Sequence, residues 1–170
     1  MKNIILIGMP GSGKSTIGVI LAKTLGVDFI DTDITIQNRT GELLYKTIER
    51  IGVKGLLDEE EKAICSLDLS DKVCVVATGG SAVLRESSMK HLAENGVFVY
   101  LSLPYSVIAR RVGNRSTRGI AAENNETLKD IYDFRKPYYQ RYADFTVDCK
   151  GNSVEKNVAE ILRVMLGMEK

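Results

Sequence analysis

Residues 3–15 read NIILIGMPGSGKS, an apolar run of strand length that leads directly into a glycine-rich segment. Residues 8–15 match the pattern G-x-x-x-x-G-K-[ST] at every specified position, and helical apolar spacing follows from Thr16 to Leu25. Between a strand and a helix, such glycines let several backbone N–H groups converge on phosphate oxygens at the positive end of the helix. The segment therefore predicts a nucleotide site in an α/β protein, rather than an incidental glycine turn.

The predicted nucleotide contacts come from the second half of this loop and the start of the helix. Lys14 supplies a point charge for the β- and γ-phosphates, and the hydroxyl of Ser15 can hold Mg²⁺. The residues that we expect to bind the nucleotide are Gly11, Ser12, Gly13, Lys14, Ser15 and Thr16.

Strand-length apolar runs alternate with helical patterns along the chain. Strands are expected at residues 3–8, 27–31, 73–80, 97–103 and 144–148. Helices are expected at residues 14–25, 33–50 with a break near Gly41, 53–68, 86–94, 105–112, 126–142 and 153–168. Several strands are continuously apolar, as in a parallel sheet that helices cover on both faces. We therefore predict a single domain, residues 1–170, with a three-layer, doubly wound α/β fold and a five-stranded parallel sheet.

The overall charge argues against a general attraction to nucleic acid or membranes. Lys plus Arg number 23 and Asp plus Glu number 22, so any basic site has to be local. No apolar stretch approaches the ~20 residues that span a bilayer, and the N-terminus has no signal-peptide pattern. We expect a cytoplasmic protein with no nucleic-acid and no membrane partner. The acidic run at residues 58–61 is interpreted as the solvated face of a helix.

Two acids end the second predicted strand. Asp31 and Asp33, in the sequence FIDTD, are expected at the carboxyl edge of the sheet, where ligands of open α/β sheets gather. One can serve a metal shell, and the other can orient or deprotonate a hydroxyl nucleophile. The alternative is that Asp33 only caps the following helix. The third strand ends in Gly79 and Gly80, which would let a ligand approach the backbone or would form a tight turn.

Basic residues gather in the second half of the chain. Residues 112–127 form a long polar stretch, which is typical of a functional or mobile loop. The arginines in or beside it are Arg110, Arg111, Arg115 and Arg118. Arginines on a closing lid would exclude water and stabilise the transferred phosphoryl group, although Arg110 and Arg115 are interpreted as surface residues. Arg135 could bind a substrate carboxylate in bidentate geometry, or could pair with an acid.

In order and spacing, these segments resemble the shikimate kinases, small P-loop kinases of the aromatic amino-acid pathway. The resemblance covers nearly the whole chain and rests on GMPGSGKSTIG (8–18), FIDTD (29–33), ATGGSAV (77–83), RRVGNRSTRG (110–119) and RKPYYQRYADFTVD (135–148). It implies the fold of the nucleoside monophosphate kinases, with substrate-binding helices at about 33–65 and a mobile lid at about 112–125. It also implies transfer of the ATP γ-phosphate, with Mg²⁺, to the 3-hydroxyl of shikimate. We expect a monomer.

The resemblance also implies roles for individual residues. On the nucleotide side, Lys14 would bind phosphate, Ser15 and (through water) Asp31 would hold Mg²⁺, Arg111 would flank the adenine, and Arg118 would be the lid arginine. On the acceptor side, Asp33 would contact the ring hydroxyls and help to activate the nucleophile, Gly79 and Gly80 would offer backbone groups, and Arg135 would grip the carboxylate.

Three departures from the family pattern concern the acceptor or the lid. In the pattern G-E-x-x-F-R-x-x-E, Leu57 stands where the family has an arginine that joins the grip on the carboxylate, and Lys54 could compensate. Ser81 replaces the third glycine of the family, and the lid reads RGIA rather than R-P-L-L from Arg118. Two alternatives stay open: a kinase of another polyol or hydroxy acid, and a nucleotide-binding regulator without catalysis.

Overall fold

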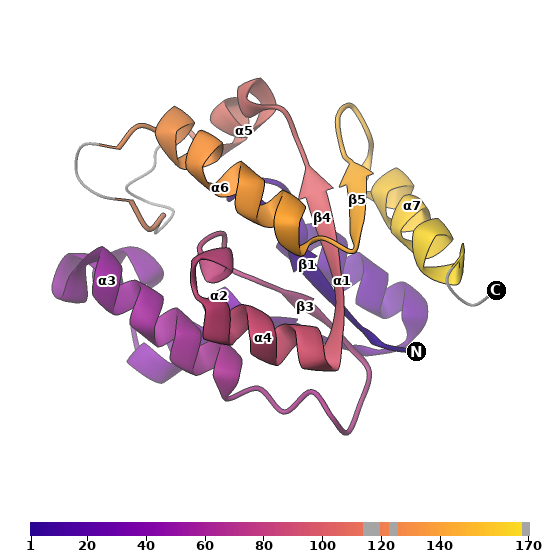
Figure 1. The fold of residues 1–170 in the computed structure, drawn as a ribbon, viewed down its shortest axis with the longest axis horizontal. Coiled ribbons are helices and arrows are strands. Elements are labelled where there is room, and N and C mark those ends of the chain that lie inside the picture. The colour runs from indigo at the N-terminus through magenta and orange to yellow at the C-terminus, as the bar shows by residue number, and fades with distance from the viewer. Residues whose placement is uncertain (114–119, 123–125, 168–170) are drawn as a thin grey trace.

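The computed structural model describes residues 1–113, 120–122 and 126–167, and its centre is a five-stranded parallel sheet (Figure 1). The strands are β1 (Asn3–Ile7), β2 (Asp28–Asp31), β3 (Cys74–Ala77), β4 (Gly96–Ser102) and β5 (Phe145–Asp148). They lie in the order β2-β3-β1-β4-β5, and every neighbouring pair is parallel. The predicted α/β fold with a five-stranded parallel sheet is confirmed.

The central strand β1 is apolar from Ile4 to Ile7 because both of its faces are buried. It pairs with β3 on one side, where Ile4 lies beside Val75, and with β4 on the other, where Ile4 lies beside Val97. Every residue of β1 and of β3 is buried. Parallel strands covered on both faces require such continuous apolar runs. The edge strands β2 and β5 keep exposed residues.

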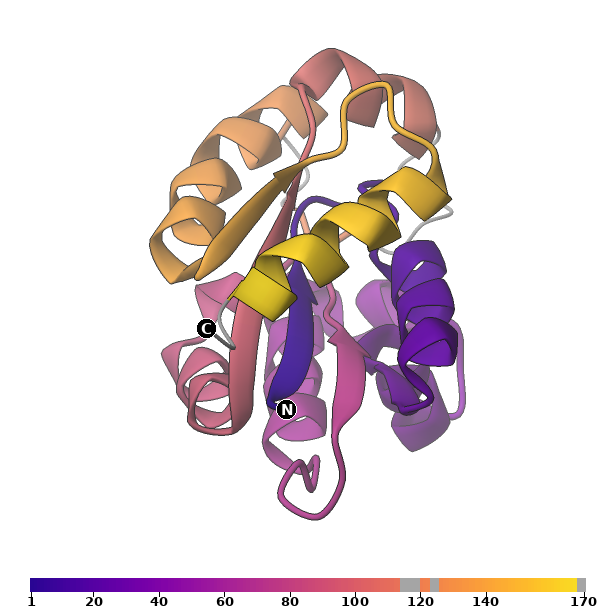
Figure 2. The ribbon, with the colours of Figure 1, turned by 90° about the vertical axis from the view of Figure 1, so that its right-hand side faces the viewer.

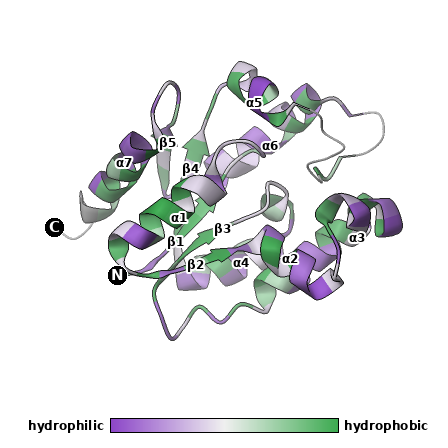
Figure 3. Cartoon of the chain, turned by 180° about the vertical axis from the view of Figure 1, so that it is seen from behind, coloured by the Kyte–Doolittle hydropathy of each residue, from purple (hydrophilic) through white to green (hydrophobic). Residues whose placement is uncertain are grey.

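Helices cover both faces of this sheet. They are α1 (Lys14–Leu25), α2 (Thr32–Thr40), α3 (Leu44–Cys65), α4 (Glu86–Asn95), α5 (Tyr105–Val112), α6 (Leu128–Tyr142) and α7 (Val154–Leu166), with a short 3-10 helix, η1 (Ala82–Leu84). Figure 1 shows α4 and α6 on one side of the sheet, and Figure 3 shows α1 in front of largely hydrophobic strands on the other, with α7 beside β5. Figure 2 shows the resulting layers from the side. In the described part of the chain, no helix has the length and apolar character needed to cross a membrane.

Glycines divide the helices between β2 and β3. Gly41 follows α2 with a φ of 73°, a left-handed conformation that glycine adopts at a helix C-terminus without strain, and this confirms the predicted break. Gly52 has a φ of 72° and a ψ of 178° inside α3, so two helical segments meet there. The two segments correspond to the predicted end of one helix near residue 50 and the start of the next at residue 53.

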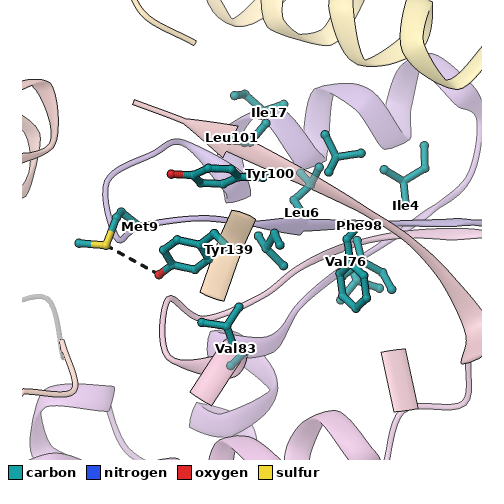
Figure 4. Packing of buried hydrophobic residues seen from close by; sticks show 14 of the residues in the cluster. Ile4, Leu6, Met9, Ile17, Val76, Val83, Phe98, Tyr100, Leu101 and Tyr139 are labelled. Carbon is teal, nitrogen blue, oxygen red and sulfur yellow. Dashed lines mark hydrogen bonds between the residues drawn. The ribbon is translucent and has the colours of Figure 1, made fainter. Parts of the chain in front are cut away.

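A buried aromatic pair joins α6 to the sheet and to the loop after β1 (Figure 4). The rings of Tyr139 and Tyr100 stack with their centroids 5.3 Å apart, and both side chains are buried. The hydroxyl of Tyr139 also lies 3.8 Å from the sulfur of Met9. This packing fixes α6 relative to the glycine-rich loop.

Candidate active site

A cavity of about 350 Å³ lies at the carboxyl edge of the sheet. Because parallel strands end at the same edge, the loop after β1, the first turn of α2 and the glycine pair after β3 all reach it. The predicted site residues that line it are Gly11, Gly13, Lys14, Ser15, Thr16, Asp33, Gly79, Gly80 and Arg135. Ser12, in the same loop, is buried and does not line the cavity. Asp31 and Arg111 are not part of the lining either.

The loop after β1 has the backbone conformation that phosphate binding requires. Gly8, Gly11 and Gly13 have φ angles of 147°, 81° and 97°, in a region that residues with side chains rarely adopt. Among the described residues, the N–H groups of Gly13, Lys14 and Ser15 have no backbone hydrogen-bond acceptor. These free donors at the positive end of α1 fit the phosphates of a nucleotide.

Lys14 is buried in the wall of the cavity. Its ammonium group donates to the carbonyl of Gly8 at 2.8 Å and to the carbonyl of Met9 at 2.9 Å. Burial lowers the pKa of Lys14 to about 8, although Asp33 and Asp31 act in the opposite direction. A bound anion would stabilise the charged ammonium, because the surrounding protein solvates it poorly.

Asp31 and Asp33 have different environments at the start of α2. Asp31 is the N-cap, and its Oδ1 accepts a hydrogen bond from the N–H of Asp33 at 3.0 Å. The alternative in which Asp33 is the cap is therefore wrong, and Asp33 lines the cavity instead. The pKa of Asp33 is raised to about 6, chiefly by burial and also by the charge of Asp31, while Lys14 acts in the opposite direction. Such a carboxylate can accept a proton near neutral pH.

The glycine pair after β3 is held by two neighbouring elements. The N–H of Gly79 donates to the hydroxyl of Thr32 at 2.9 Å, and the carbonyl of Gly80 accepts from the hydroxyl of Tyr139 at 2.6 Å. A Cβ on Gly80 would lie 2.6 Å from Cδ of Pro10, so only glycine fits against the loop after β1. In the described part of the chain the N–H of Gly80 has no hydrogen-bond partner, which leaves it as the backbone donor of this pair.

Arg135 extends from α6 into the cavity and is only 3% exposed. Its Nη2 donates to the carbonyl of Ala121. No salt bridge joins Arg135 to an acid among the residues that the structure describes. A buried guanidinium without an acidic partner fits the binding of an anionic group, which would satisfy its remaining donors and its charge.

Glu60 is a residue of the cavity that the sequence analysis missed. The interpretation of residues 58–61 as a solvated face is wrong for Glu60, which is 2% exposed, whereas Glu59 and Glu61 are partly exposed. The helical period of 3.6 residues already indicates that four successive side chains cannot share one face. The hydroxyl of Ser81 donates to Oε2 of Glu60 at 2.6 Å, and burial raises the pKa of Glu60 to about 7.

The predicted arginines differ in position. Arg111 is exposed at the end of α5, where its Nη1 donates to the carbonyl of Gly11 at 3.3 Å. Arg110 is exposed, as predicted. Arg115 and Arg118 lie outside the described residues, so the role predicted for Arg118 stays a prediction.

The donor set is small for a metal ion. In the part of the chain that the structure describes, no three His, Cys, Asp or Glu side chains form a cluster that could hold a metal. Mg²⁺ in kinases is bound by one or two protein groups together with water and substrate phosphates. Ser15, exposed in the cavity, and the N-cap Asp31 therefore fit a Mg²⁺ ion that binds together with a nucleotide.

Comparison with known proteins identifies the family. The family model described as shikimate kinase matches residues 10–166. The chain belongs to the shikimate kinase family. A shikimate kinase from Thermodesulfovibrio yellowstonii is 36% identical over 165 residues, covering 96% of this chain and 94% of that protein. Human threonine synthase-like 1 is 35% identical over 161 residues, covering 94% of this chain but 21% of that longer protein.

Solved structures of shikimate kinases agree with this assignment. The enzyme from Acinetobacter baumannii in complex with shikimate has a TM-score of 0.89 and 31% sequence identity, covering 98% of this chain and 94% of that chain. The enzyme from Aquifex aeolicus has a TM-score of 0.85 and 28% identity, covering 98% of each chain. The predicted family, fold class and kinase class are thereby confirmed.

The first departure from the shikimate kinase pattern leaves fewer cations on the acceptor side. Leu57 packs beside an apolar cluster that includes Leu56, and it lines a second cavity of about 70 Å³ rather than the main one. Lys54 is exposed and does not line the main cavity, so the structure gives no support to compensation by Lys54. Within the described residues, the cations that line the main cavity are Lys14 and Arg135.

Part of the segment predicted to form a lid reaches the same cavity in this shikimate kinase family member. Ile120 and Ala121, from RGIA, are both buried and both line it. Since the carbonyl of Ala121 accepts a hydrogen bond from Arg135, this part of the predicted lid segment contacts the residue predicted to bind the acceptor carboxylate.

Proposed function

We propose that the chain transfers the γ-phosphoryl group of ATP to the 3-hydroxyl of shikimate, in the synthesis of aromatic amino acids. The observation that carries the proposal is that Lys14, Asp33 and Arg135, from α1, α2 and α6, line one cavity. A kinase of a hydroxy acid needs these three groups for the phosphates, the reacting hydroxyl and the acid group respectively. Membership of the shikimate kinase family supports the same reaction.

On the donor side, the chain binds and orients ATP. Bound ATP with Mg²⁺ supplies the phosphoryl group and neutralises part of its charge. Lys14 would hold the β- and γ-phosphates, and Ser15 and (through water) Asp31 would hold Mg²⁺. The remaining nucleotide contacts come from Gly11, Ser12, Gly13 and Thr16, and Arg111 flanks the adenine. The free N–H groups at the start of α1 support this arrangement.

On the acceptor side, the chain orients one hydroxyl toward the phosphates and removes its proton. Asp33 accepts this proton, and its pKa of about 6 leaves it largely ionised at neutral pH. The N–H of Gly80 binds the acceptor, and Gly79 permits a close approach because it has no side chain. Arg135 grips the carboxylate through the fork of its guanidinium group.

We further infer a single kinase domain that works as a monomer in the cytoplasm. In this arrangement the helices at about 33–65 bind the acceptor, and the segment at about 112–125 is a lid whose Arg118 stabilises the transferred group. The monomeric state stays a prediction, and the use of ATP supports the cytoplasm.

A second candidate is an ATP-dependent kinase of another polyol or hydroxy acid. Leu57 favours it, because a carboxylate that loses a charge-assisted partner loses typically ~1.5–3 kcal/mol. A nucleotide-binding regulator without catalysis is disfavoured, because Lys14 and Asp33 both line the cavity in suitable positions.

The test is an assay that couples ADP release to a measured signal, with shikimate, gluconate and nucleoside monophosphates as acceptors. We expect ADP release with shikimate and none with the other compounds. No turnover of shikimate at millimolar concentration would reject the assignment, and turnover of gluconate would establish the second candidate. Tight binding of ATP without turnover of any acceptor would point to the regulator.

A further inference from the structure

Two departures from the family pattern lie near one buried carboxyl group. Ser81 stands where the family has its third glycine, and its hydroxyl donates to Oε2 of Glu60 at 2.6 Å. A glycine at this position could not form that bond. Leu57 precedes Glu60 by about one helical turn on α3 and lines the second cavity, so it supplies no charge to the acceptor side. The acceptor wall therefore has a carboxyl–hydroxyl pair and lacks the arginine of the family.

The other oxygen of Glu60 lies beside the glycine pair. Oε1 is 2.1 Å from the position that a Cβ on Gly79 would occupy, and Oδ1 of Asp33 is 2.9 Å from that same position. A side chain at this position would have to displace the carboxyl groups of Glu60 and Asp33. Since Ser81 engages Oε2, Oε1 is the oxygen that remains for a ligand in the cavity.

The charged groups around Glu60 come from several elements. Lys14, Asp33 and Arg135 act on it from α1, α2 and α6. Arg85 is engaged in salt bridges with Asp58 and Glu61, two other acids of α3. The two cations that line the cavity are thus shared between two carboxyl groups, and an anionic acceptor would have to enter beside both.

Both protonation states of Glu60 are accessible near neutral pH. Its pKa is raised to about 7, chiefly by burial and also by the charge of Asp33, whereas the hydrogen bond from Ser81 acts in the opposite direction. The neutral acid can donate a hydrogen bond, but the carboxylate can only accept. An anionic acceptor therefore meets a donor when Glu60 is protonated and a like charge when it is ionised.

We propose that Glu60, oriented by Ser81, is a specificity-determining residue that donates a hydrogen bond from protonated Oε1 to the carboxylate of the acceptor, beside Arg135. This neutral donor takes the place of the cation that Leu57 does not supply. The proposal rests on the proposed function, because it requires an acceptor whose carboxylate is bound by Arg135. As a consequence, the affinity for a hydroxy acid falls as Glu60 loses its proton at rising pH. The affinity for the nucleotide does not depend on the ionisation of Glu60.

The experiment measures the KM for shikimate, at saturating ATP and Mg²⁺, between about pH 6 and about pH 8.5. In the wild type we expect KM to rise by about tenfold or more across this range, because each pH unit above the pKa reduces the protonated fraction about tenfold. Calorimetric titration of shikimate in the presence of ADP should show the same rise in Kd, which provides a measurement independent of turnover.

Three variants separate acceptor binding from a structural role. Glu60→Gln keeps a donor but cannot ionise, so its KM should stay within about twofold over the same range. Ser81→Gly removes a hydrogen bond that favours the carboxylate, so the midpoint of the rise should move to higher pH. Glu59→Gln, on the same helix but engaged with Lys62 at the surface, is the matched control and should keep the wild-type profile. If Glu60→Gln does not fold, the role of Glu60 is decided by whether the midpoint of the KM rise moves to higher pH in Ser81→Gly.

The outcomes distinguish this proposal from the proposed function. A wild-type KM that does not change with pH, or an equal rise in wild type and Glu60→Gln, would overturn the role of Glu60 while shikimate turnover still stands. An unmoved midpoint in Ser81→Gly would overturn the orienting role of Ser81. Absence of shikimate turnover and of shikimate binding at every pH would instead remove both proposals.

Discussion

The hydroxyl of Tyr139 donates a 2.6 Å hydrogen bond to the carbonyl of Gly80, so α6 holds the backbone of the glycine pair in place. Tyr139 is buried, stacks on Tyr100 and follows Arg135 by about one helical turn. One helix therefore positions both the guanidinium group and the backbone donor that we assign to the acceptor. This makes Tyr139 a positioning residue, because it lies behind the glycine pair and does not line the cavity.

We predict that Tyr139→Phe weakens acceptor binding more than nucleotide binding. The substitution leaves a buried carbonyl without its partner, which costs about 1–3 kcal/mol. Because Gly80 would then lose its fixed orientation, we expect the KM for shikimate to rise by about tenfold, with little change in the KM for ATP. Steady-state kinetics with each substrate varied in turn would measure this.

Tyr132→Phe is the matched control for this prediction. Tyr132 lies on the same helix, and its hydroxyl donates to the carbonyl of Leu103 at 2.9 Å, away from the cavity. It should lower the free energy of unfolding by a similar amount and leave the KM for shikimate unchanged. Equal changes in KM for Tyr132→Phe and Tyr139→Phe would show that only general stability is involved.

The fold and the nucleotide side of the site could be predicted because their signals are local. Continuous apolar strands such as β1 indicate a parallel sheet buried on both faces. The loop at residues 8–15 needs glycine because its backbone adopts positive φ angles, which side chains disfavour, and any sequence with this pattern shares that need. Gly8, Gly11 and Gly13 do have positive φ angles. Such features depend on neighbours in sequence, so they can be recognised without tertiary structure.

The acceptor side was harder to predict because tertiary packing decides it. Both Asp31 and Asp33 are good N-cap residues, and a shift of the helix start by one or two positions determines which of them faces the cavity. Glu60 belongs to an acidic run, and only the packing of α3 against its neighbours shows which of four acids is buried. The bond between Ser81 and Glu60 joins residues 21 positions apart, and neither residue type indicates the other.

We predict that Asp33→Asn removes turnover while nucleotide binding persists. The amide cannot accept the proton of the attacking hydroxyl, and the loss of a general base typically reduces the rate by about 10²–10⁴-fold. Asp33 lies on the acceptor side of the cavity, so the Kd for ATP should change little. Single-turnover kinetics and calorimetric titration of ATP would measure the two effects separately.

Asp28→Asn serves as the control, because Asp28 is an exposed acid at the start of β2, the strand that leads into α2 and Asp33. It should keep wild-type turnover. An Asp33→Asn protein whose kcat stays within about tenfold of the wild type would exclude Asp33 as the group that removes the proton.

We predict that Arg135→Lys raises the KM for shikimate and leaves the KM for ATP nearly unchanged. Lysine keeps the charge but has no planar fork, so it cannot bind a carboxylate in bidentate geometry. Loss of a charge-assisted hydrogen bond costs about 1.5–3 kcal/mol, which corresponds to a KM increase of roughly ten- to a hundredfold. Arg141→Lys, at an exposed position of the same helix, should have no effect on either KM. If both variants bind shikimate as the wild type does, the carboxylate is held elsewhere.

We predict that Glu60→Gln changes the pH dependence of stability. Burial raises the pKa of Glu60 from 4.5 to about 7. Between these values the native protein retains a proton that the unfolded chain has released, so the free energy of unfolding falls as the pH rises through this window and does not fall further above it. Glutamine does not ionise, so Glu60→Gln should be more stable than the wild type at pH 7.5 by about 1–3 kcal/mol and equally stable near pH 4.5.

Urea unfolding at both pH values would measure this difference. Asp33 has a pKa raised to about 6 and is present in wild type and variant, so only its coupling to Glu60 differs between the two proteins. The lowered pKa of Lys14, about 8, affects stability only at higher pH and lies outside the window. Glu59→Gln removes a carboxylate that is stabilised at the surface by Lys62, so it should not raise stability at pH 7.5. A parallel fall in stability for wild type and Glu60→Gln would mean that Glu60 is ionised in the native protein well below pH 7, and its role as a neutral donor to the acceptor would then fail as well.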